Sequence, residues 1–464
     1  MKDVDTVASR HATRSAVHAL TTWAEDVEIG AMPAAVLERA LAVLCDDLAV
    51  IVGARDEPEV AAFHRNVLDR AERREATVFR GGRPMTDRIS AAVANAVAAD
   101  WLELDEGYRI TPCHAGLHVI PALAATAEAR DLPLADVLRA LVLGYEIVTR
   151  VARCWEPPHF NHQTHARYGA VGACAAVALA LRASAPLVQS ALAAAATLTT
   201  AGPRSHLVSG ALVRNVWPAQ AAWSGMMSVE WAECGIGGSI DGLHDVYTML
   251  LGTAAQPPVL TNNLGEAFAI MDGYTKVFAC CQHLHSAIEA TLALRDEVLR
   301  AGGMDAIVDI AVATHPAALA LVNAHPATTL AAKFSLPHAV AAALATGSGG
   351  ADAFFANTLN APAIAPLRER VHAESYLPLP APPHDRPARV AIRLHDGRVI
   401  TSECRSAAGG PDRPFAPDVV FAKARGLTEP VYPNFVPVFE DLRRLDATRL
   451  ATGWRRIVDE LCAH

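Results

Sequence analysis

Residues 100–123 constrain the fold more than any other stretch of this chain. Three acids, Glu103, Asp105 and Glu106, follow an alanine-rich apolar run with helical spacing. A short loop then leads to His114 and to a new apolar helix. Carboxylates at the C-terminal end of a helix oppose its macrodipole, so their presence there has a cost. We therefore expect the end of one helix and the start of the next to hold these acids and the imidazole in one crevice.

Alanine supplies much of the apolar content of the chain. Hydrophobic residues make up 52% of the 464 residues, whereas aromatic residues make up only 6%. Alanine has the highest helix propensity and lets helix axes approach closely, so this balance favours tightly packed helices. The length suggests two or three domains with well-buried cores.

The character of the chain changes near residue 255. Before that point, apolar residues recur at helical spacing in about ten segments that proline and glycine separate. Later, β-branched residues alternate at 307–313 and 388–394, and helical patterns return in the tail. We therefore predict a mainly α fold with a smaller α+β domain. The predicted boundaries are 1–264 and 406–464 for the helical domain and 265–405 for the α+β domain.

Net charge and cysteine content restrict the partners of the protein. A formal charge of −9 argues against nucleic acid or an anionic membrane as the main partner. Any anionic substrate would therefore need a local basic pocket. The residues after Met1 do not resemble a secretion signal, and no apolar run reaches membrane-spanning length. Nine cysteines without paired spacing indicate reduced thiols, so we expect a cytoplasmic protein.

No motif for a metal or an organic cofactor is apparent in the sequence. A P-loop, a G-x-G-x-x-G before a helix and a four-ligand zinc spacing are all missing. His159, His162 and His165 lie within seven residues, which raises a metal site as an alternative. Their loop supplies no carboxylate or thiolate at ligand spacing, so we predict no metal. The chemistry is then expected to come from side chains alone.

Six stretches of the chain form a recognisable series in order and spacing. They are 44–49, 102–106, 113–116, His165, 273–281 and 332–337. Together they make nearly the whole chain resemble the MmgE/PrpD family, which includes 2-methylcitrate dehydratases, cis-aconitate decarboxylases and iminodisuccinate epimerases. The resemblance implies a large helical domain built from both chain ends and a smaller α+β lid domain. It also implies a homodimer that works without metal or organic cofactor.

Enzymes of this family, the resemblance implies, break a bond next to a carboxylate of a di- or tricarboxylate. Removing such a proton needs a positioned base, and cations must stabilise the charge that develops on the carboxylate. By its motif, His114 is predicted to be the general acid or base, and Lys276 is predicted to reach into the crevice. His165 opens a helix of small residues, and Glu103 stands where the family has an aspartate. These four are the predicted catalytic residues.

Five further residues are predicted to bind substrate. Arg214 stands where many members have lysine, and its planar fork suits bidentate binding of a carboxylate. Cys281 falls where the decarboxylase branch carries a histidine. Trp217 follows the basic residue by three positions and is expected to narrow or flatten the pocket. Arg109 in the loop before His114 and His338 in a helix of the lid domain complete the set.

We therefore predict a cytoplasmic, cofactor-independent lyase of the dehydratase or decarboxylase type that acts on a small polycarboxylate. The first alternative is an epimerase, which would need two bases on opposite faces of one carbon. The second is a family member that has lost catalysis and only binds a ligand, because its acidic motif is altered. The bulk of Trp217 further predicts that 2-methylcitrate is a poor substrate.

Overall fold

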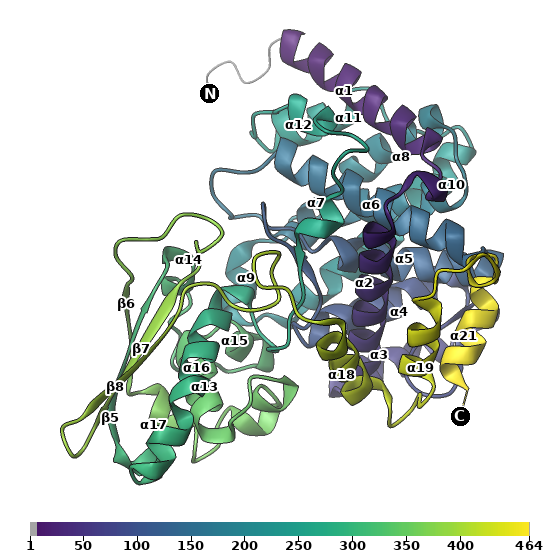
Figure 1. The fold of residues 1–464 in the computed structure, drawn as a ribbon. Helices are drawn as coiled ribbons and strands as arrows, with labels where there is room; N and C mark the ends of the chain where they lie inside the picture. The colour runs from purple at the N-terminus through teal and green to yellow at the C-terminus, as the bar shows by residue number, and fades with distance from the viewer. Residues whose placement is uncertain (1–6, 464) are drawn as a thin grey trace.

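In the computed structural model of the protein, the structure is described for residues 7–463. The fold is mainly helical with one small sheet, as predicted, and Figure 1 shows the helical bundle on one side and the sheet on the other. The helices of the bundle are α1 (Val7–Asp26), α2 (Ala34–Gly53), α3 (Pro58–Leu68), α4 (Arg88–Trp101), α5 (Ala115–Arg130), α6 (Leu134–Cys154), α7 (Thr164–Ala180), α8 (Ala185–Thr197), α9 (Arg204–Ser209), α10 (Trp217–Glu233), α11 (Gly242–His244), α12 (Pro258–Thr261), α18 (Pro417–Thr428), α19 (Phe435–Leu442), α20 (Ala447–Leu450) and α21 (Trp454–Cys462).

Small residues let the central helices approach closely. Every residue of α7 is buried, and it packs against α5, α6 and α10. A Cβ added to Gly225 in α10 would lie 2.6 Å from the backbone nitrogen of Cys174 in α7. A Cβ on Gly144 in α6 would lie 3.1 Å from the Cα of Ala176. Helix axes this close require glycine and alanine, which is the physical reason for the composition of the chain.

The C-terminal segment completes the helical bundle. Helix α18 packs against α2, and α21 packs against α5. A Cβ on Gly53 at the end of α2 would lie 2.7 Å from a side-chain carbon of Leu427, so this contact is tight. The helical region is therefore built from both ends of the chain, as the resemblance implies.

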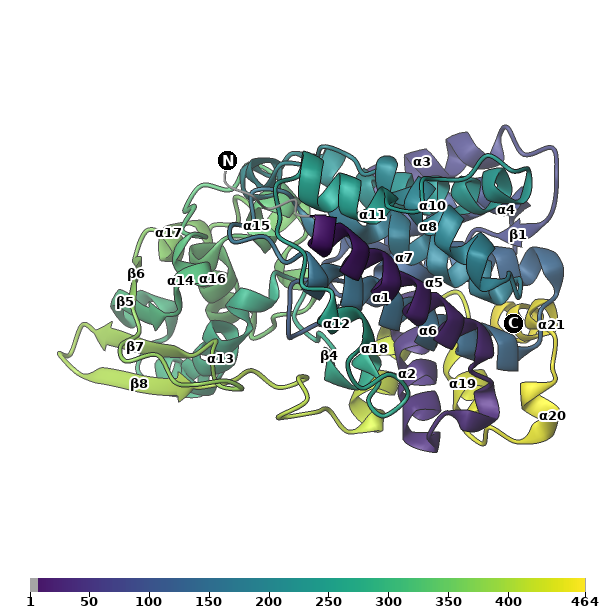
Figure 2. The same ribbon diagram turned by 90° about the horizontal axis from the view of Figure 1, so that it is seen from above.

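The second region is a four-stranded sheet covered by helices. The strand order is β6-β5-β7-β8, with β5 parallel to β6 and antiparallel to β7. In Figures 1 and 2, α13 and α16 lie between the sheet and the helical bundle. The short edge strand β6 is not predicted from the sequence. The elements are β5 (Ile307–Thr314), β6 (Val371–Ser375), β7 (Ala388–Leu394), β8 (Val399–Cys404), α13 (His285–Arg300), α14 (Pro316–Leu319), α15 (Thr329–Lys333), α16 (Leu336–Thr346) and α17 (Ala365–Arg368).

Two very short strand pairs lie outside this sheet. Strand β1 (Ala76–Thr77) pairs with β2 (Met85–Thr86) beside the bundle. Strand β3 (Gly107–Tyr108) pairs with β4 (Gly273–Tyr274), and this contact is not predicted from the sequence. It joins the loop after the acidic residues to the segment that contains Lys276, so two distant parts of the chain meet at one place.

Candidate active site

A cavity lies where the helical region meets the α+β region. Residues of the loops around 103–114, 160–164 and 204–214 line it from the helical side. Residues between 274 and 283, together with Phe334 and Arg386, line it from the other side. The cationic side chains of the lining are Arg204, Arg214, Lys276 and Arg386, and Glu103 is the carboxylate among them. This local excess of positive charge contrasts with the net charge of −9 of the whole chain.

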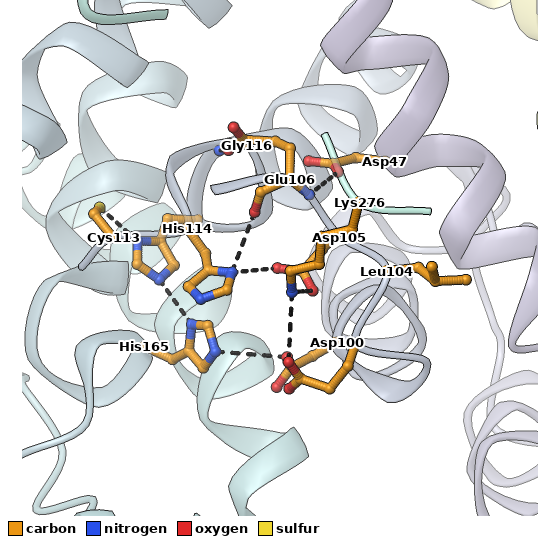
Figure 3. A network of polar contacts seen from close by, with 12 residues as sticks. Asp47, Asp100, Leu104, Asp105, Glu106, Cys113, His114, Gly116, His165 and Lys276 are labelled. Atoms are coloured by element: carbon orange, nitrogen blue, oxygen red, sulfur yellow. Dashed lines mark hydrogen bonds and ion pairs between the residues drawn. The ribbon is translucent and has the colours of Figure 1, made fainter. Parts of the chain in front are cut away.

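His114 lies directly before α5, and its side chain lines the cavity while remaining only 16% exposed. Figure 3 shows its imidazole pointing to Asp105. The Nδ1 atom lies 2.6 Å from Oδ2 of Asp105 and 3.1 Å from the carbonyl oxygen of Glu106. Both partners accept hydrogen bonds, so Nδ1 carries the proton of the neutral ring and Nε2 does not. Nε2 is therefore the atom that can accept a proton from a ligand.

Three carboxylates and two cations form a buried cluster beside this histidine. The Nζ atom of Lys276 lies 3.4 Å from Glu103 and 3.3 Å from Asp105. Arg214 forms an ion pair with Asp100 and lies 2.5 Å from Glu103. None of these five side chains is more than 2% exposed. Burying so many charges is costly, and here each is held by an oppositely charged partner.

Two charges in this cluster, those of Asp105 and Lys276, are held in fixed protonation states. Burial alone would raise the pKa of Asp105, but Lys276 and His114 lower it well below its usual value. Burial would lower the pKa of Lys276, yet Asp105 and Glu103 raise it above its usual value. Asp105 is therefore a carboxylate and Lys276 an ammonium at any ordinary pH. The carboxylate fixes the tautomer of His114 and would stabilise its protonated ring.

Two further histidines lie behind His114, away from the cavity. The ring of His165 is fully buried, and its centroid is 4.8 Å from that of His114. Its Nδ1 atom lies 3.0 Å from Nε2 of His118, and its Nε2 atom lies 3.5 Å from Asp100. Burial, with smaller effects from Arg214 and His114, lowers the pKa of His165 well below its usual value. Burial and His114 lower the pKa of His118 to about 3. Both rings are neutral, and their position suits holding His114 in place.

Glu106 and Asp47 form a buried carboxyl pair beneath the loop. The backbone N–H of Glu106 donates to the carboxyl of Asp47 at 3.1 Å. The carboxyl of Glu106 accepts from the N–H of Gly116 at 2.5 Å and from the hydroxyl of Tyr145 at 3.0 Å. Burial raises the pKa of Glu106 to about 7, and burial and Glu106 raise that of Asp47 well above its usual value. The pair therefore retains a proton near neutral pH, and it anchors the first turn of α5.

Gly116 is required by this arrangement. A Cβ at this position would lie 2.3 Å from Oδ2 of Asp47 and 2.9 Å from the carboxyl of Glu106. The backbone of α5 can therefore reach the carboxyl pair only with glycine here.

Arg109 does not line the cavity, although the sequence predicts it to bind substrate. Its guanidinium pairs with Asp385 at 2.9 Å and with Asp412 at 3.3 Å. Asp385 lies in the loop that connects β6 to β7, and Asp412 lies in the segment that connects β8 to α18 of the helical bundle. The structure therefore assigns Arg109 to holding these connections, and we withdraw its predicted role in substrate binding.

Trp217 and His338 also lie outside the lining of the cavity. The indole of Trp217 stacks on His206 with a centroid distance of 6.4 Å and an interplanar angle of 20°. His338 is fully buried, and its Nε2 atom lies 3.1 Å from the carbonyl oxygen of Ala353. Neither side chain can contact a ligand in this cavity as it stands. Trp217 therefore gives no reason to expect that 2-methylcitrate is excluded from this cavity.

Of the remaining predicted residues, Arg214, Glu103, Lys276 and Cys281 line the cavity together with His114. Arg204, Arg386 and His283 also line it, although they are not predicted from the sequence. The two arginines stand next to prolines, Pro203 and Pro387, outside the family motifs, Arg204 as the first residue of α9 and Arg386 in the loop before β7. Their proximity depends on tertiary structure, so no local signal identifies them.

The three histidines of the loop around residue 160 do not converge on one point. The Nε2 atom of His162 lies 2.6 Å from the carbonyl oxygen of Thr200, and His165 faces His118. Within residues 7–463, no three His, Cys, Asp or Glu side chains are grouped so that they could hold a metal ion. Over the same range, no helix combines the length and the apolar character needed to cross a bilayer.

Comparisons with known proteins agree with this architecture. Residues 18–255 match the MmgE/PrpD N-terminal domain, and residues 278–436 match the MmgE/PrpD C-terminal domain. The chain belongs to the MmgE/PrpD family. It is 25% identical, over 96% of each chain, to a cis-aconitate decarboxylase-like protein, oryM, of Aspergillus oryzae. It is 24% identical to a cis-aconitate decarboxylase of Aspergillus terreus, over 83% of this chain and 84% of that protein.

Proposed function

We propose that this MmgE/PrpD protein is a lyase that removes a proton next to a carboxylate of a small di- or tricarboxylate. The observation that carries the proposal is a cationic cavity with an oriented histidine in a chain of net charge −9. Family membership and distant relatives named for cis-aconitate decarboxylase point to the same broad class, a decarboxylase or dehydratase.

The geometry supports a division of labour between base and cations. His114 accepts the proton on Nε2, and Asp105 stabilises the imidazolium that forms. Lys276 and Arg214 face the charge that develops on the adjacent carboxylate. Glu103 lies between these two cations and fixes their positions. In a dehydration, the protonated His114 is also available to return its proton to a leaving hydroxyl.

The arrangement favours a lyase over an epimerase. An epimerase would need a second base on the opposite face of the reacting carbon. The imidazole beside His114 belongs to His165, which is fully buried and does not line the cavity. His283 does line it, but burial, Arg386 and further neighbouring cations lower its pKa well below its usual value. His283 is therefore a weak base.

We further propose that the enzyme works in the cytoplasm as a homodimer, without metal or organic cofactor, as the family resemblance implies. Seven large apolar side chains between residues 213 and 250 are exposed, and exposed apolar side chains of this kind would suit a dimer interface if they lie together. The side chains concerned fall within one stretch of the chain. They are Val213, Val216, Trp223, Ile236, Ile240, Met249 and Leu250. Light scattering on the purified protein tests this proposal, and a monomeric mass contradicts it.

The activity is tested by incubating the protein with cis-aconitate, 2-methylcitrate and smaller diacids in D₂O. NMR then follows deuterium uptake and product formation for each acid. We expect exchange at a carbon next to a carboxylate, together with loss of water or carbon dioxide. Exchange with inversion and no lyase product would identify an epimerase. Binding of a polyacid without any exchange would identify a protein that has lost catalysis.

A further inference from the structure

Arg204 and Arg386 differ from the other cations of the cavity in lacking a carboxylate partner. Within the described part of the chain, neither side chain forms an ion pair with an aspartate or a glutamate. Lys276 and Arg214 are instead surrounded by three carboxylates, so that cluster has no net positive charge. The excess positive charge of the cavity therefore comes from Arg204 and Arg386.

Both arginines are held in place by neutral groups. The backbone N–H of Arg204 donates to the carbonyl oxygen of Asn161 at 2.8 Å. The carbonyl oxygen of Arg386 accepts from the hydroxyl of Ser286 at 2.6 Å, and its guanidinium donates to the side chain of Gln282. These contacts fix the backbone of Arg204 and the guanidinium of Arg386 without neutralising either charge, so both charges remain available to an anion.

The neighbouring carboxylate is kept away from Arg386. Asp385 precedes it in the chain, but Asp385 pairs with Arg109 at 2.9 Å. Arg109 thus does more than fix the loop, because it engages an acid that would otherwise compete for Arg386. The guanidinium of Arg386 remains available in the cavity wall.

The two arginines act on the same part of the wall. Burial is the largest cause of the lowered pKa of His283, and both arginines lower it further. Burial raises the pKa of Cys281, and Lys276 and Arg204 oppose that rise. Residues 281–283 therefore lie within the field of both guanidiniums. Arg204 comes from the helical side and Arg386 from the loop before β7, so an anion held by both would contact both regions of the protein.

We propose that Arg204 and Arg386 form a subsite for a second carboxylate, remote from the carbon that loses its proton at His114. The inference rests on the proposed function, and it makes these arginines the residues that select di- and tricarboxylates over monocarboxylates. Guanidinium groups suit this role because each can bind a carboxylate through two parallel N–H groups.

Calorimetric binding at fixed ionic strength tests the subsite with three probes, tricarballylate, succinate and acetate. We expect Arg204→Gln and Arg386→Gln each to weaken tricarballylate and succinate by about ten- to a hundredfold, as for loss of a hydrogen bond to a charged group. Acetate binding should be unchanged. Arg386→Lys should recover part of the loss. The control is Arg393→Gln, which removes an exposed arginine of β7.

The outcomes separate the subsite from the proposed function. Tricarballylate binding that is unchanged in both glutamine variants would overturn the subsite and leave the proposed function standing. An equal loss for all three probes, or the same loss in Arg393→Gln, would also overturn it, because a general field effect would then suffice. Failure of the wild-type protein to bind any polyacid would overturn both proposals. Melting temperatures of all variants verify that they are folded.

Discussion

The charged lining of the cavity falls into two parts, here called walls, each drawn from both the helical and the α+β region, and they differ in how their side chains are partnered. Beside His114, Lys276 and Asp105 have oppositely charged partners within 3.4 Å and are shielded from solvent. On the other wall, Arg204 and Arg386 have no carboxylate partner within the described residues, and the guanidinium of Arg386 donates to Gln282. The charges of the first wall are therefore balanced within the protein, whereas we expect those of the second to be balanced by a ligand. The first suits proton transfer, and the second suits recognition.

Replacing Lys276 by methionine is expected to damage the first wall most severely. Glu103 and Asp105 would remain buried without their ammonium partner, and breaking a buried ion pair in this way costs about 3–5 kcal/mol. Catalysis should be lost as well, because the cation facing the reacting carboxylate is gone. Denaturant unfolding measures the first effect, and deuterium exchange measures the second.

Lys333→Met is the matched control for that variant. Lys333 is also buried, but its ammonium donates to the carbonyl oxygen of Trp101 and does not line the cavity. We expect a smaller loss of stability, about 1–2 kcal/mol, and an unchanged rate of exchange. Equal loss of activity in the two variants would show that Lys276 has no special place in the reaction.

His114→Gln is expected to remove the base while leaving the walls in place. Loss of a general acid or base typically lowers the rate about a hundred- to ten-thousandfold. The fold should survive, since the glutamine amide can still donate to Asp105. Single-turnover exchange in D₂O measures the rate. His206→Gln, at an exposed position outside the lining, provides the control. A rate above about a tenth of wild type would exclude His114 as the base.

Glu106→Gln tests whether the protonated carboxyl pair supports the first wall. The pKa of Glu106 is raised from 4.5 to about 7 in the folded protein, so its protonated form stabilises the fold. This contribution is full below about pH 4.5 and is lost as the pH rises toward 7, a total of about 3 kcal/mol.

The glutamine variant cannot ionise, so its stability should fall less than that of the wild type between pH 4.5 and 7. Urea unfolding at several pH values measures this difference. Glu429→Gln, at an exposed position, should follow the wild-type curve. Parallel curves for the wild type and Glu106→Gln would mean that Glu106 is already ionised in the folded state.

Exhaustive chelation is expected to have the smallest effect, because the proposed reaction uses side chains alone. Turnover after dialysis against EDTA should equal that of the untreated enzyme. The histidines near residue 160 contact Thr200 and His118 in place of a common ligand, which gives the expectation its structural basis. Loss of activity that a single divalent metal restores would contradict it.

The same contrast between the walls explains what the sequence could predict. Helices that depend on local spacing are predicted well, and α5 begins at Ala115, directly after His114. The motif residues Lys276 and Arg214 also reach the cavity as predicted. Each belongs to a stretch whose neighbours in the chain identify it.

The residues that escaped prediction depend on contacts between distant segments. Arg204 begins the short helix α9 and Arg386 lies in the loop before β7, and only the folded chain shows that neither has a carboxylate partner among the described residues. The predicted position of Trp217 in the pocket differs from the structure for another reason. Its spacing from Arg214 is right for the family, but the start of α10 turns its indole toward His206. Spacing along a chain does not specify the direction of a side chain at the junction of two elements.

The pairing of β3 with β4 has a consequence for the synthesis of this protein. The acidic loop leaves the ribosome long before strand β4 and Lys276, and α18 follows later still. Until then, Asp105 and Glu103 lack the ammonium that makes their burial tolerable. We therefore expect the amino-terminal helices to reach their final packing only after strand β4 and Lys276 have been synthesised. Until the last helices emerge, the incomplete bundle would expose apolar surface that is normally covered.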